Sequence, residues 1–196
     1  MLRVDDTVLV LLAAGRSSRF GAGDNKLEQV LAGKPLGLHV ADALTDMAFL
    51  ERVAIVGGGR LDYGSRGFAC IRNEDPASGM ARSVRLGVVQ AEARGARAVL
   101  IVLADMPRVT AAHVGRLFAA SEDDMSVVAS SDGRSGKPPA LFGRGRFTGL
   151  RNLSGDAGAR DLIRAGRHVI ALPGELIDVD THAELDALQA PCGHED

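Results

Sequence analysis

Residues 7–26 decide the fold, and they read TVLVLLAAGRSSRFGAGDNK. The apolar run at residues 8–12 is too short for a lone helix and ends at small residues and a glycine, which is typical of a buried parallel strand. Three cations follow it, Arg16, Arg19 and Lys26. A strand that runs into a small, basic loop is where α/β proteins hold phosphate groups. The stretch therefore predicts a phosphate-binding loop, and the alternative is an ordinary βα turn with two solvated arginines. Neither G-x-x-x-x-G-K-[ST] nor G-x-G-x-x-G is present.

The rest of the chain alternates between apolar runs and amphipathic stretches. Further strands are expected at residues 52–56, 67–71, 98–103, 126–129, 138–142, 168–172 and 176–179. Helices are expected at residues 38–47, 81–93, 110–120, 156–165 and 181–188, with Thr110 and Thr181 as caps. This alternation predicts a doubly wound α/β fold, with a mostly parallel, Rossmann-like sheet in three α/β/α layers and a less regular part after residue 130. The run AVLIVL at 98–103 is the most hydrophobic, which favours a central strand.

The composition fits one domain with a real core. The chain has 196 residues, of which 46% are apolar and only 4% aromatic. The core must therefore be built from Val, Leu, Ile and Ala, as in parallel sheets. We expect a single domain over residues 1–190 and a polar tail at 191–196.

The charge and the small number of cysteines argue against several classes of protein. The net charge of −2 gives no general attraction to nucleic acid, and no apolar run approaches the roughly 18 residues that a membrane span needs. The first residues lack a signal-peptide layout, because Arg3 is followed by Asp5 and Asp6. Cys70 and Cys192 are too few for a zinc site or a disulfide framework. We expect a cytoplasmic protein that binds neither nucleic acid nor membrane.

A carboxylate follows the central strand directly. Asp105 comes two residues after the run at 98–103, and Pro107 stops the strand from continuing. The carboxyl edge of an open α/β sheet is where ligands bind, and Mg²⁺ prefers a few hard oxygens together with substrate phosphates. Asp105 is therefore a candidate metal ligand, and the alternatives are a helix N-terminal carboxylate or a simple strand-end turn.

A second carboxylate is expected on the other side of the metal. The sequence DVDT at 178–181 lies before a capped helix, and Asp180 is favoured over Asp178 as the ligand. Asp156 is a third possibility. The alternative is that Asp180 or Thr181 merely caps the helix that follows.

Several of these motifs together resemble those of one family. LAAGRSSRFG followed by a lysine, LADMP at 103–107 and DVDT at 178–181 are similar to the signatures of the molybdopterin nucleotidyltransferase family, and especially of the molybdenum cofactor cytidylyltransferases. That family has a GT-A-like NTP-transferase fold, similar to the nucleotide-diphospho-sugar transferases. The resemblance implies a nucleotide-binding part at about residues 1–125 and an acceptor-binding part at about 126–190.

The resemblance also implies roles for particular residues. The first loop would wrap the triphosphate of the nucleotide through Leu12, Ala13, Ala14, Gly15, Arg16, Arg19 and Lys26. Arg16, Lys26 and Asp105 would be catalytic, and Asp105 and Asp180 would hold Mg²⁺. The base and ribose would lie against Gly57, Gly58, Asn73, Gly79 and Ser83, although the two glycines at 57 and 58 are also compatible with a flexible turn.

The acceptor side is expected at Pro107, Gly136, Lys137, Pro138 and Asp156. The segment GKPP at 136–139 is similar to a Gly-Asn-Pro-Val segment of the family, and here a lysine replaces the asparagine, which suits an anionic acceptor. The alternative for this segment is a proline-stiffened turn before a strand.

The implied reaction is Mg²⁺-dependent transfer of CMP from CTP to a molybdopterin-type cofactor, with release of pyrophosphate. Ala14 favours CTP, because LAAG is similar to the cytidine form of the family and LAGG to the guanosine form. One alternative is GTP, or another phosphorylated acceptor such as a sugar phosphate, methylerythritol phosphate or phospholactate. Another is a non-catalytic protein that binds the molybdenum cofactor and passes it to a partner molybdoenzyme.

Overall fold

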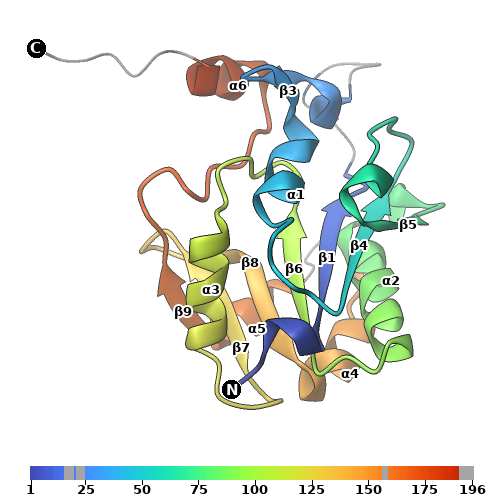
Figure 1. Cartoon of the computed structure of the whole chain (residues 1–196), viewed down its shortest axis with the longest axis vertical. Helices are drawn as coiled ribbons and strands as arrows, with labels where there is room; N and C mark the ends of the chain where they lie inside the picture. The colour runs from blue at the N-terminus through green and yellow to red at the C-terminus, as the bar shows by residue number, and fades with distance from the viewer. Residues whose placement is uncertain (16–19, 21–24, 156–158, 190–196) are drawn as a thin grey trace, which may run out of the picture.

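A seven-stranded sheet runs through the molecule (Figure 1), and its strand order is β5-β4-β1-β6-β8-β7-β9. The structure is a computed structural model, and it describes residues 1–15, 20, 25–155 and 159–189. The strands are β1 (Thr7–Ala13), β4 (Glu51–Val56), β5 (Ala69–Arg72), β6 (Ala98–Leu103), β7 (Val127–Ser131), β8 (Gly136–Gly143) and β9 (Arg167–Ile170), and a separate hairpin is formed by β2 (Val30–Leu31) and β3 (Lys34–Pro35).

The helices connect these strands. They are α1 (His39–Ala43), α2 (Met80–Ala93), α3 (Ala111–Ala119), α4 (Phe147–Arg151), α5 (Arg160–Ala165) and α6 (His182–Gln189). Short 3-10 turns add η1 (Val4–Asp6), η2 (Lys26–Glu28), η3 (Leu36–Leu38), η4 (Gly64–Arg66), η5 (Pro76–Ser78) and η6 (Arg144–Arg146). None of the helices in the described ranges has the length and hydropathy that crossing a membrane requires.

The sheet is mostly parallel, as the sequence predicts. β1 pairs in parallel with β4 and β6, β4 with β5, and β7 with β9. β8 is the exception, because it runs antiparallel to both β6 and β7. β6 is the fourth of the seven strands, so the prediction of a central position for residues 98–103 is confirmed.

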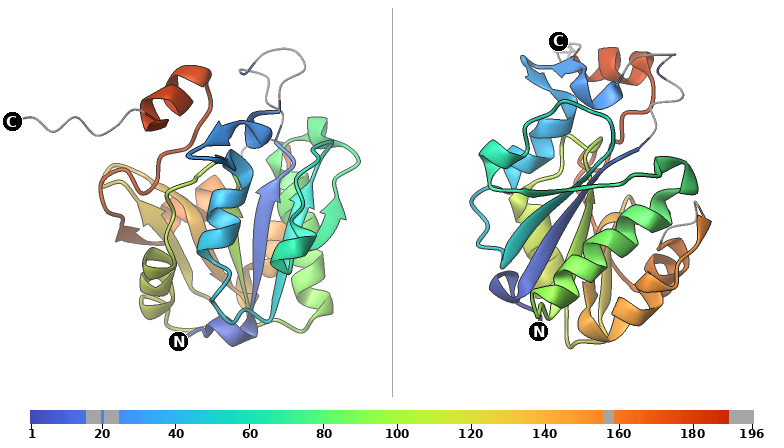
Figure 2. Two further views of the ribbon diagram at one scale, coloured as in Figure 1. Left: turned by 45° about the horizontal axis from the view of Figure 1, so that its top comes forward. Right: turned by 90° about the vertical axis from the view of Figure 1, so that its right-hand side faces the viewer.

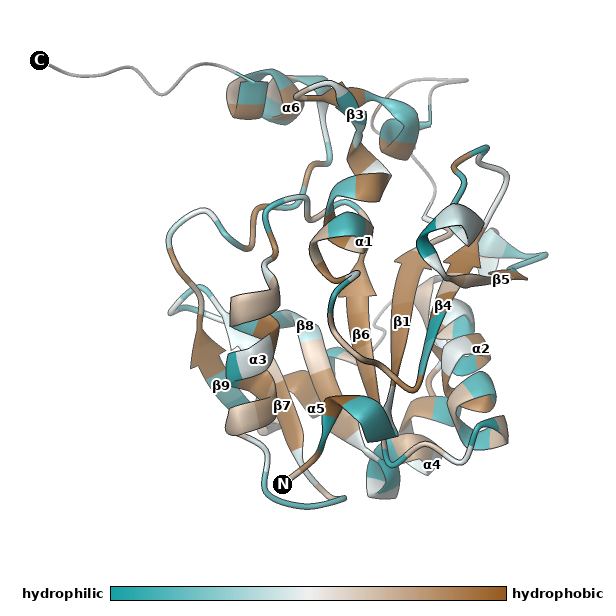
Figure 3. Ribbon diagram, in the orientation of Figure 1, coloured by the Kyte–Doolittle hydropathy of each residue, from teal (hydrophilic) through white to brown (hydrophobic). Residues whose placement is uncertain are grey.

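Helices cover both faces of the sheet, with α1 and α3 on one side and α2, α4 and α5 on the other (Figure 2). Alternation along the strands supplies both cores: Leu9 and Leu11 of β1 pack with Val40 and Val114, while Val8 and Val10 lie in the cluster that contains Val84 and Phe147. Figure 3 shows these strands as the most hydrophobic part of the ribbon. The predicted three-layer α/β fold is confirmed.

A third, smaller cluster closes the end of the molecule where β1 and β6 finish. Phe20, Leu31, Leu36, Val179 and Leu185 are buried together there, so that α6 lies beside the β2–β3 hairpin (Figure 1). The side-chain amide of Gln189 also donates to the carbonyl of Val30 at 2.6 Å.

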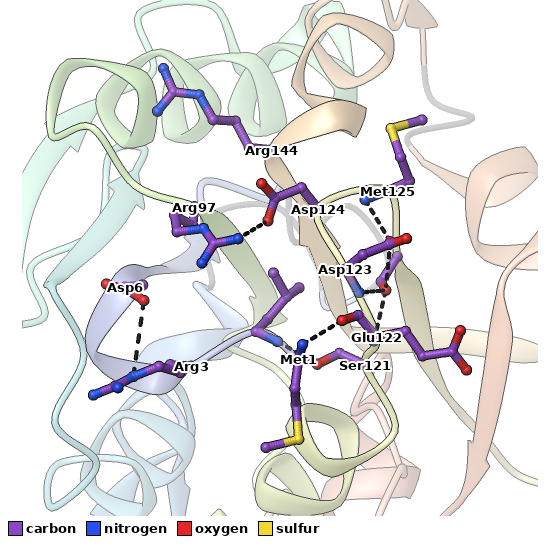
Figure 4. Close-up of polar contacts among 12 residues, drawn as sticks. Met1, Arg3, Asp6, Arg97, Ser121, Glu122, Asp123, Asp124, Met125 and Arg144 are labelled. Carbon is purple, nitrogen blue, oxygen red and sulfur yellow. Dashed lines mark hydrogen bonds and ion pairs between the residues drawn. The ribbon is translucent and has the colours of Figure 1, made fainter.

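The opposite end of the sheet is fixed by the amino terminus. The backbone N–H of Leu2 donates to Ser121 Oγ at 2.9 Å, and the terminal amine of Met1 donates to the carbonyl of Glu122 (Figure 4). Nearby, Arg97 pairs with Asp124 at 2.7 Å. These contacts attach the start of the chain to the loop before β7, far from the carboxyl ends of the parallel strands.

Two predicted elements differ in the structure. The strand predicted at residues 176–179 is wrong: this segment joins no sheet of the described residues, although Val179 N–H donates to the carbonyl of Asp105 at 3.0 Å. Its apolar character reflects the burial of Leu176 in the main core cluster and of Val179 in the third cluster. The helix predicted at 38–47 is shorter in the structure: α1 covers only His39–Ala43, η3 precedes it at Leu36–Leu38, and residues 44–47 form a turn. Thr45 Oγ1 donates to the carbonyl of Ala41 at 3.1 Å, and such a bond weakens helical structure. Residues 156–158 of the helix predicted at 156–165 lie outside the described residues, and α5 begins at Arg160.

Candidate active site

The carboxyl ends of β1 and β6 lie side by side. Leu12 is in register with Leu103, and the N–H of Ala104 donates to the carbonyl of Leu12 at 3.1 Å. The segments that leave these two strands therefore begin at neighbouring points of the sheet edge. One contains Gly15 and the other contains Asp105.

Lys26 joins that edge to the segment before α6. Its Nζ lies 2.6 Å from Asp105 Oδ2 and 2.8 Å from Asp180 Oδ1. The backbone at Lys26 is set by η2, whose start is capped by the side chain of Asn25, which accepts from Leu27 N–H at 3.1 Å. Asp105 and Asp180 are 79 and 154 residues away from Lys26 in the sequence, yet both contact its ammonium group.

The ion pairs keep Lys26 charged in spite of its burial. The side chain of Lys26 is only 10% exposed. Burial alone would lower its pKa, but the charges and hydrogen bonds of Asp105 and Asp180 outweigh that effect and raise the pKa above its ordinary value. The ammonium is therefore a permanent positive charge at this edge of the sheet.

Only one of the two carboxylate oxygens of Asp105 has a partner among the described residues. While Oδ2 accepts from Lys26, Oδ1 is buried and has no hydrogen-bond partner among the described residues. A buried carboxylate oxygen without a partner is costly unless a cation or a donor meets it. The described residues contain no group of three or more His, Cys, Asp or Glu that could hold a metal by themselves. Two carboxylates combined with nucleotide phosphates fit Mg²⁺, which keeps few protein ligands.

The backbone at Asp180 is held by a capping box that sequence reasoning missed. Glu184 Oε2 accepts from the N–H groups of Asp180 and Thr181, both at 2.8 Å, while Thr181 Oγ1 accepts from Glu184 N–H at 3.2 Å. The cap of α6 is therefore Thr181, and the Asp180 side chain extends to Lys26 instead. The T-x-x-E spacing at 181–184 is the signal from which Glu184 could have been found.

Asp178 lies close enough to Asp105 and Asp180 for their negative charges to affect its pKa. The residue is exposed, but its carboxyl group is partly desolvated. This desolvation, followed by the negative charges of Asp105 and Asp180, raises the pKa of Asp178. Asp180, and not Asp178, lies at ion-pair distance from Lys26 among the residues that the structure describes, at 2.8 Å.

The predicted nucleotide side gathers around the ends of β1 and β4. A Cβ built on Gly57 would lie 3.5 Å from Ala14 Cα, so these two segments are in close contact, whereas a Cβ on Gly58 would meet nothing within 4 Å. Asn73 and Ser83 are both buried and hydrogen-bonded to each other at 3.0 Å. The structure thus brings Asn73 and Ser83 together as a pair.

Gly79 and Asn73, two of the residues predicted to bind the nucleotide, also shape the loop between β5 and α2. Gly79, which caps α2, has φ of +88°, a region that favours glycine. Asn73 holds its own loop, because its side-chain oxygen accepts from Asp75 N–H at 3.0 Å and its N–H donates to the carbonyl of Val56 at 2.8 Å. Both residues therefore have structural roles in the loop between β5 and α2.

The predicted acceptor segment starts β8. Because β8 is antiparallel to β6, Gly136 and Pro138 lie at the edge of the sheet where β6 ends. Lys137 pairs with Asp132 across the β7–β8 turn at 2.9 Å, and a Cβ on Gly136 would collide with His168 Nε2 at 2.5 Å. Pro107 is buried just after Asp105.

Three predicted residues lie outside the described residues: Arg16 and Arg19 of the first loop, and Asp156.

Comparison with known proteins identifies the family. Residues 9–170 match the MobA-like NTP transferase domain. "Purine catabolism protein PucB" of Bacillus subtilis (strain 168) is 31% identical over 201 residues, which cover 92% of this chain and 94% of that protein.

Solved structures share the fold. Rv0371c from Mycobacterium tuberculosis H37Rv, in complex with manganese, is 23% identical with a TM-score of 0.72, over 93% of this chain and 97% of that one. The inositol-1-phosphate CTP transferase from T. maritima is 14% identical with a TM-score of 0.65, over 96% of both chains. With the family match covering most of the chain, the protein belongs to the MobA-like NTP transferase domain family and is a nucleotidyltransferase of that type.

Proposed function

We propose that this protein transfers CMP from CTP to the phosphate of a molybdopterin-type acceptor, with release of pyrophosphate and with Mg²⁺ as the metal. The observation that carries this proposal is the meeting of Lys26 with Asp105 and Asp180 beside the end of β1. A cation can neutralise phosphate charge, and two carboxylates can hold a metal that orients the phosphates, which are the contributions that nucleotidyl transfer relies on.

The metal assignment is supported by the chemistry of the two carboxylates. Asp105 offers a buried oxygen that lacks a partner among the described residues, and Asp180 is 36% exposed on its side chain, which leaves it open to solvent and ligand. The manganese complex of Rv0371c is a fold relative with a divalent cation. When bound, Mg²⁺ would neutralise charge on the phosphates and orient them.

The residues of the chain would bind the acceptor phosphate and the triphosphate and hold them in line for the transfer. An oxygen of the acceptor phosphate forms a bond to the α-phosphorus of CTP, and the bond from that phosphorus to the bridging oxygen of the β-phosphate breaks. The electron pair leaves with pyrophosphate. An acceptor phosphate is ionised at neutral pH, so no general base is required. Lys26, together with Arg16 and Arg19 of the first loop, would neutralise the departing pyrophosphate.

The nucleotide is assigned from the first loop and the base pocket. Ala14 in LAAG favours CTP, and the inositol-1-phosphate CTP transferase from T. maritima is a fold relative. We place the base and ribose against Gly57, Gly58, Asn73, Gly79 and Ser83. These residues belong to the nucleotide part, at about residues 1–125, of a single domain over residues 1–190.

The acceptor is assigned to the edge at the start of β8. Lys137 would turn from Asp132 to an anionic acceptor, with Pro107, Gly136, Pro138 and Asp156 around it in the part at about 126–190. A molybdoenzyme that receives the product is the partner that this acceptor implies.

A panel of substrates tests the proposal. The protein is incubated with Mg²⁺, each of CTP, GTP, UTP and ATP, and each of molybdopterin, a sugar phosphate, methylerythritol phosphate and phospholactate, and pyrophosphate is measured. We expect release with CTP and molybdopterin above all other pairs. Release with GTP or another acceptor would contradict the assigned substrates but keep the reaction. Tight nucleotide binding without release for every acceptor would instead indicate a non-catalytic cofactor-binding protein.

A further inference from the structure

We propose that Lys26 is a resident counter-ion of the Asp105–Asp180 pair, which a divalent cation must displace, so that metal binds tightly only together with a nucleotide whose phosphates accept the lysine. This inference rests on the proposed metal site. It adds an order to the binding events that the site alone does not require.

The positions of the atoms make lysine and metal competitors. The ammonium of Lys26 is within 2.8 Å of one oxygen from each carboxylate. Mg²⁺ or Mn²⁺ shared by the same two carboxylates would need a place about 2 Å from an oxygen of each. A divalent ion there would stand within a few ångströms of the ammonium, where two like charges repel strongly in a partly buried setting.

The carboxylates need a cation at all times. The side chains of Asp105 and Asp180 are 19% and 36% exposed, and Asp178 adds a third negative charge close to them. Carboxylates that share a site repel each other unless a positive charge lies between them. Lys26 supplies that charge in the protein without ligand, which stabilises the fold of the empty site.

Lys26 can leave by movement of its side chain alone. Its backbone is fixed, because its carbonyl accepts from Gln29 N–H at 3.2 Å and η2 is capped by Asn25. The ammonium is at the end of a flexible four-carbon chain, and η2 follows the first loop directly in sequence. A triphosphate held by that loop therefore offers Lys26 new negative partners at the moment when metal takes over the carboxylates.

This exchange makes nucleotide and metal bind cooperatively. Without nucleotide, a metal brings a second positive charge to the two carboxylates while no phosphate is present to accept Lys26. With nucleotide, the phosphates compensate the lysine. Linkage requires that nucleotide increases the metal affinity by the same factor by which metal increases the nucleotide affinity, and such factors are typically about 5–150-fold.

The test measures Mn²⁺ affinity with and without CTP, and without any acceptor. Free Mn²⁺ is followed by electron paramagnetic resonance during titration of the wild type, Lys26→Met, Lys26→Gln and Lys26→Arg. Lys34→Met is the matched control, because Lys34 pairs with Asp42 and its loss changes the net charge equally. Thermal unfolding confirms that each variant is folded, and the amide of Lys26→Gln retains hydrogen-bond donors for the carboxylates if Lys26→Met does not fold.

We expect Mn²⁺ alone to bind Lys26→Met and Lys26→Gln at least about tenfold more tightly than the wild type, with Lys34→Met and Lys26→Arg unchanged. The gain in Mn²⁺ affinity that CTP produces should be smaller in the two neutral variants. If the neutral variants bind Mn²⁺ alone no better than the wild type, although CTP recruits Mn²⁺ to the wild type, the counter-ion role is refuted and the metal site stands. If no protein binds Mn²⁺ even with CTP, the proposed metal site itself is refuted.

Discussion

Ala14 is the residue whose side chain tests the choice of nucleotide. It is 8% exposed at the end of β1, and its Cα would lie 3.5 Å from a Cβ on Gly57. Ala14→Gly removes one methyl group and turns LAAG into LAGG. A change of this size in a binding pocket is worth roughly 10-fold or more in discrimination, and the space gained suits a larger purine. We expect the ratio of kcat/KM for CTP to that for GTP to fall about tenfold, measured by pyrophosphate release.

Unfolding curves of Ala14→Gly serve as the control for folding. A folded variant with an unchanged CTP-to-GTP ratio would contradict the assignment of Ala14 to nucleotide choice.

The sequence could identify the residues of the site but not their contacts. Asp105 follows the most apolar strand, and Asp180 precedes a capped helix, so both positions follow from local pattern. That Lys26 bridges them could not be predicted, because side chains separated by 79 and 154 residues meet only through the whole topology. The choice between Asp178 and Asp180 likewise depends on how Glu184 holds the loop, which fixes the direction of the Asp180 backbone. The functional roles of all these residues stay predictions.

Helix α2 lies unusually close to β1, and Gly87 is the reason. A Cβ at Gly87 would be 2.4 Å from Val10 Cγ1 and 2.8 Å from its Cγ2. Because a valine side chain has almost no freedom to turn away, the helix itself must shift. Gly87→Ala should lower the free energy of unfolding by about 1–3 kcal/mol, measured by urea denaturation.

Gly115 provides the matched control within α3. It is exposed, and a Cβ there would meet nothing within 4 Å. Gly115→Ala should raise the free energy of unfolding by up to about 1 kcal/mol, because alanine favours a helix more than glycine does. Equal effects of the two substitutions would show that close packing of α2 on β1 is not what limits residue 87.

A buried polar network connects α3, β7 and the segment before Asp180. The fully buried His113 has Nε2 2.7 Å from Ser130 Oγ, and Ser130 Oγ donates to the carbonyl of Pro139 at 2.8 Å. His113 Nδ1 accepts from Arg116 at 2.8 Å, and Arg116 donates to Glu175 at 3.3 Å. The network therefore requires neutral His113 with its proton on Nε2.

The network makes stability depend on pH. Burial lowers the pKa of His113 most. The negative charge of Glu175 raises the pKa and the positive charge of Arg116 lowers it, so that the pKa stays below its ordinary 6.5. The unfolded chain then takes up a proton at higher pH than the folded protein does, so stability is lost as the pH falls through 6.5. We expect a lower free energy of unfolding at pH 5.5 than at pH 7.5 in urea, and a smaller difference in His113→Gln. Equal slopes for both proteins would contradict a neutral, buried His113.

Elements with strong local signals could be predicted, and those set by context could not. β1, β6, α2 and α3 follow from apolar periodicity and from the Thr110 cap, whose side chain accepts from His113 N–H at 3.1 Å. The segment at 176–179 has the composition of a strand, yet a strand exists only where a neighbour pairs with it, and here one bond to Asp105 is made.

At the scale of the molecule, the three layers and the parallel order follow from the alternation of strands and helices. The reversed direction of β8 was not predicted. The signal for it is the connection of four residues, 132–135, between β7 and β8, which is too short for a crossover and imposes an antiparallel pair. This reversal matters, because it brings the start of β8 to the edge where β1 and β6 end.

Asp105 and Lys26 should act together on one triphosphate at that edge. Asp105→Asn tests it, since the variant leaves Asp180 to pair with Lys26 and should fold normally. The measurement is pyrophosphate release from CTP with Mg²⁺ and molybdopterin. We predict release by the wild type and a rate at least about 100-fold lower in Asp105→Asn with an unchanged unfolding midpoint. If folded Asp105→Asn releases pyrophosphate at the wild-type rate, Asp105 does not act on the triphosphate.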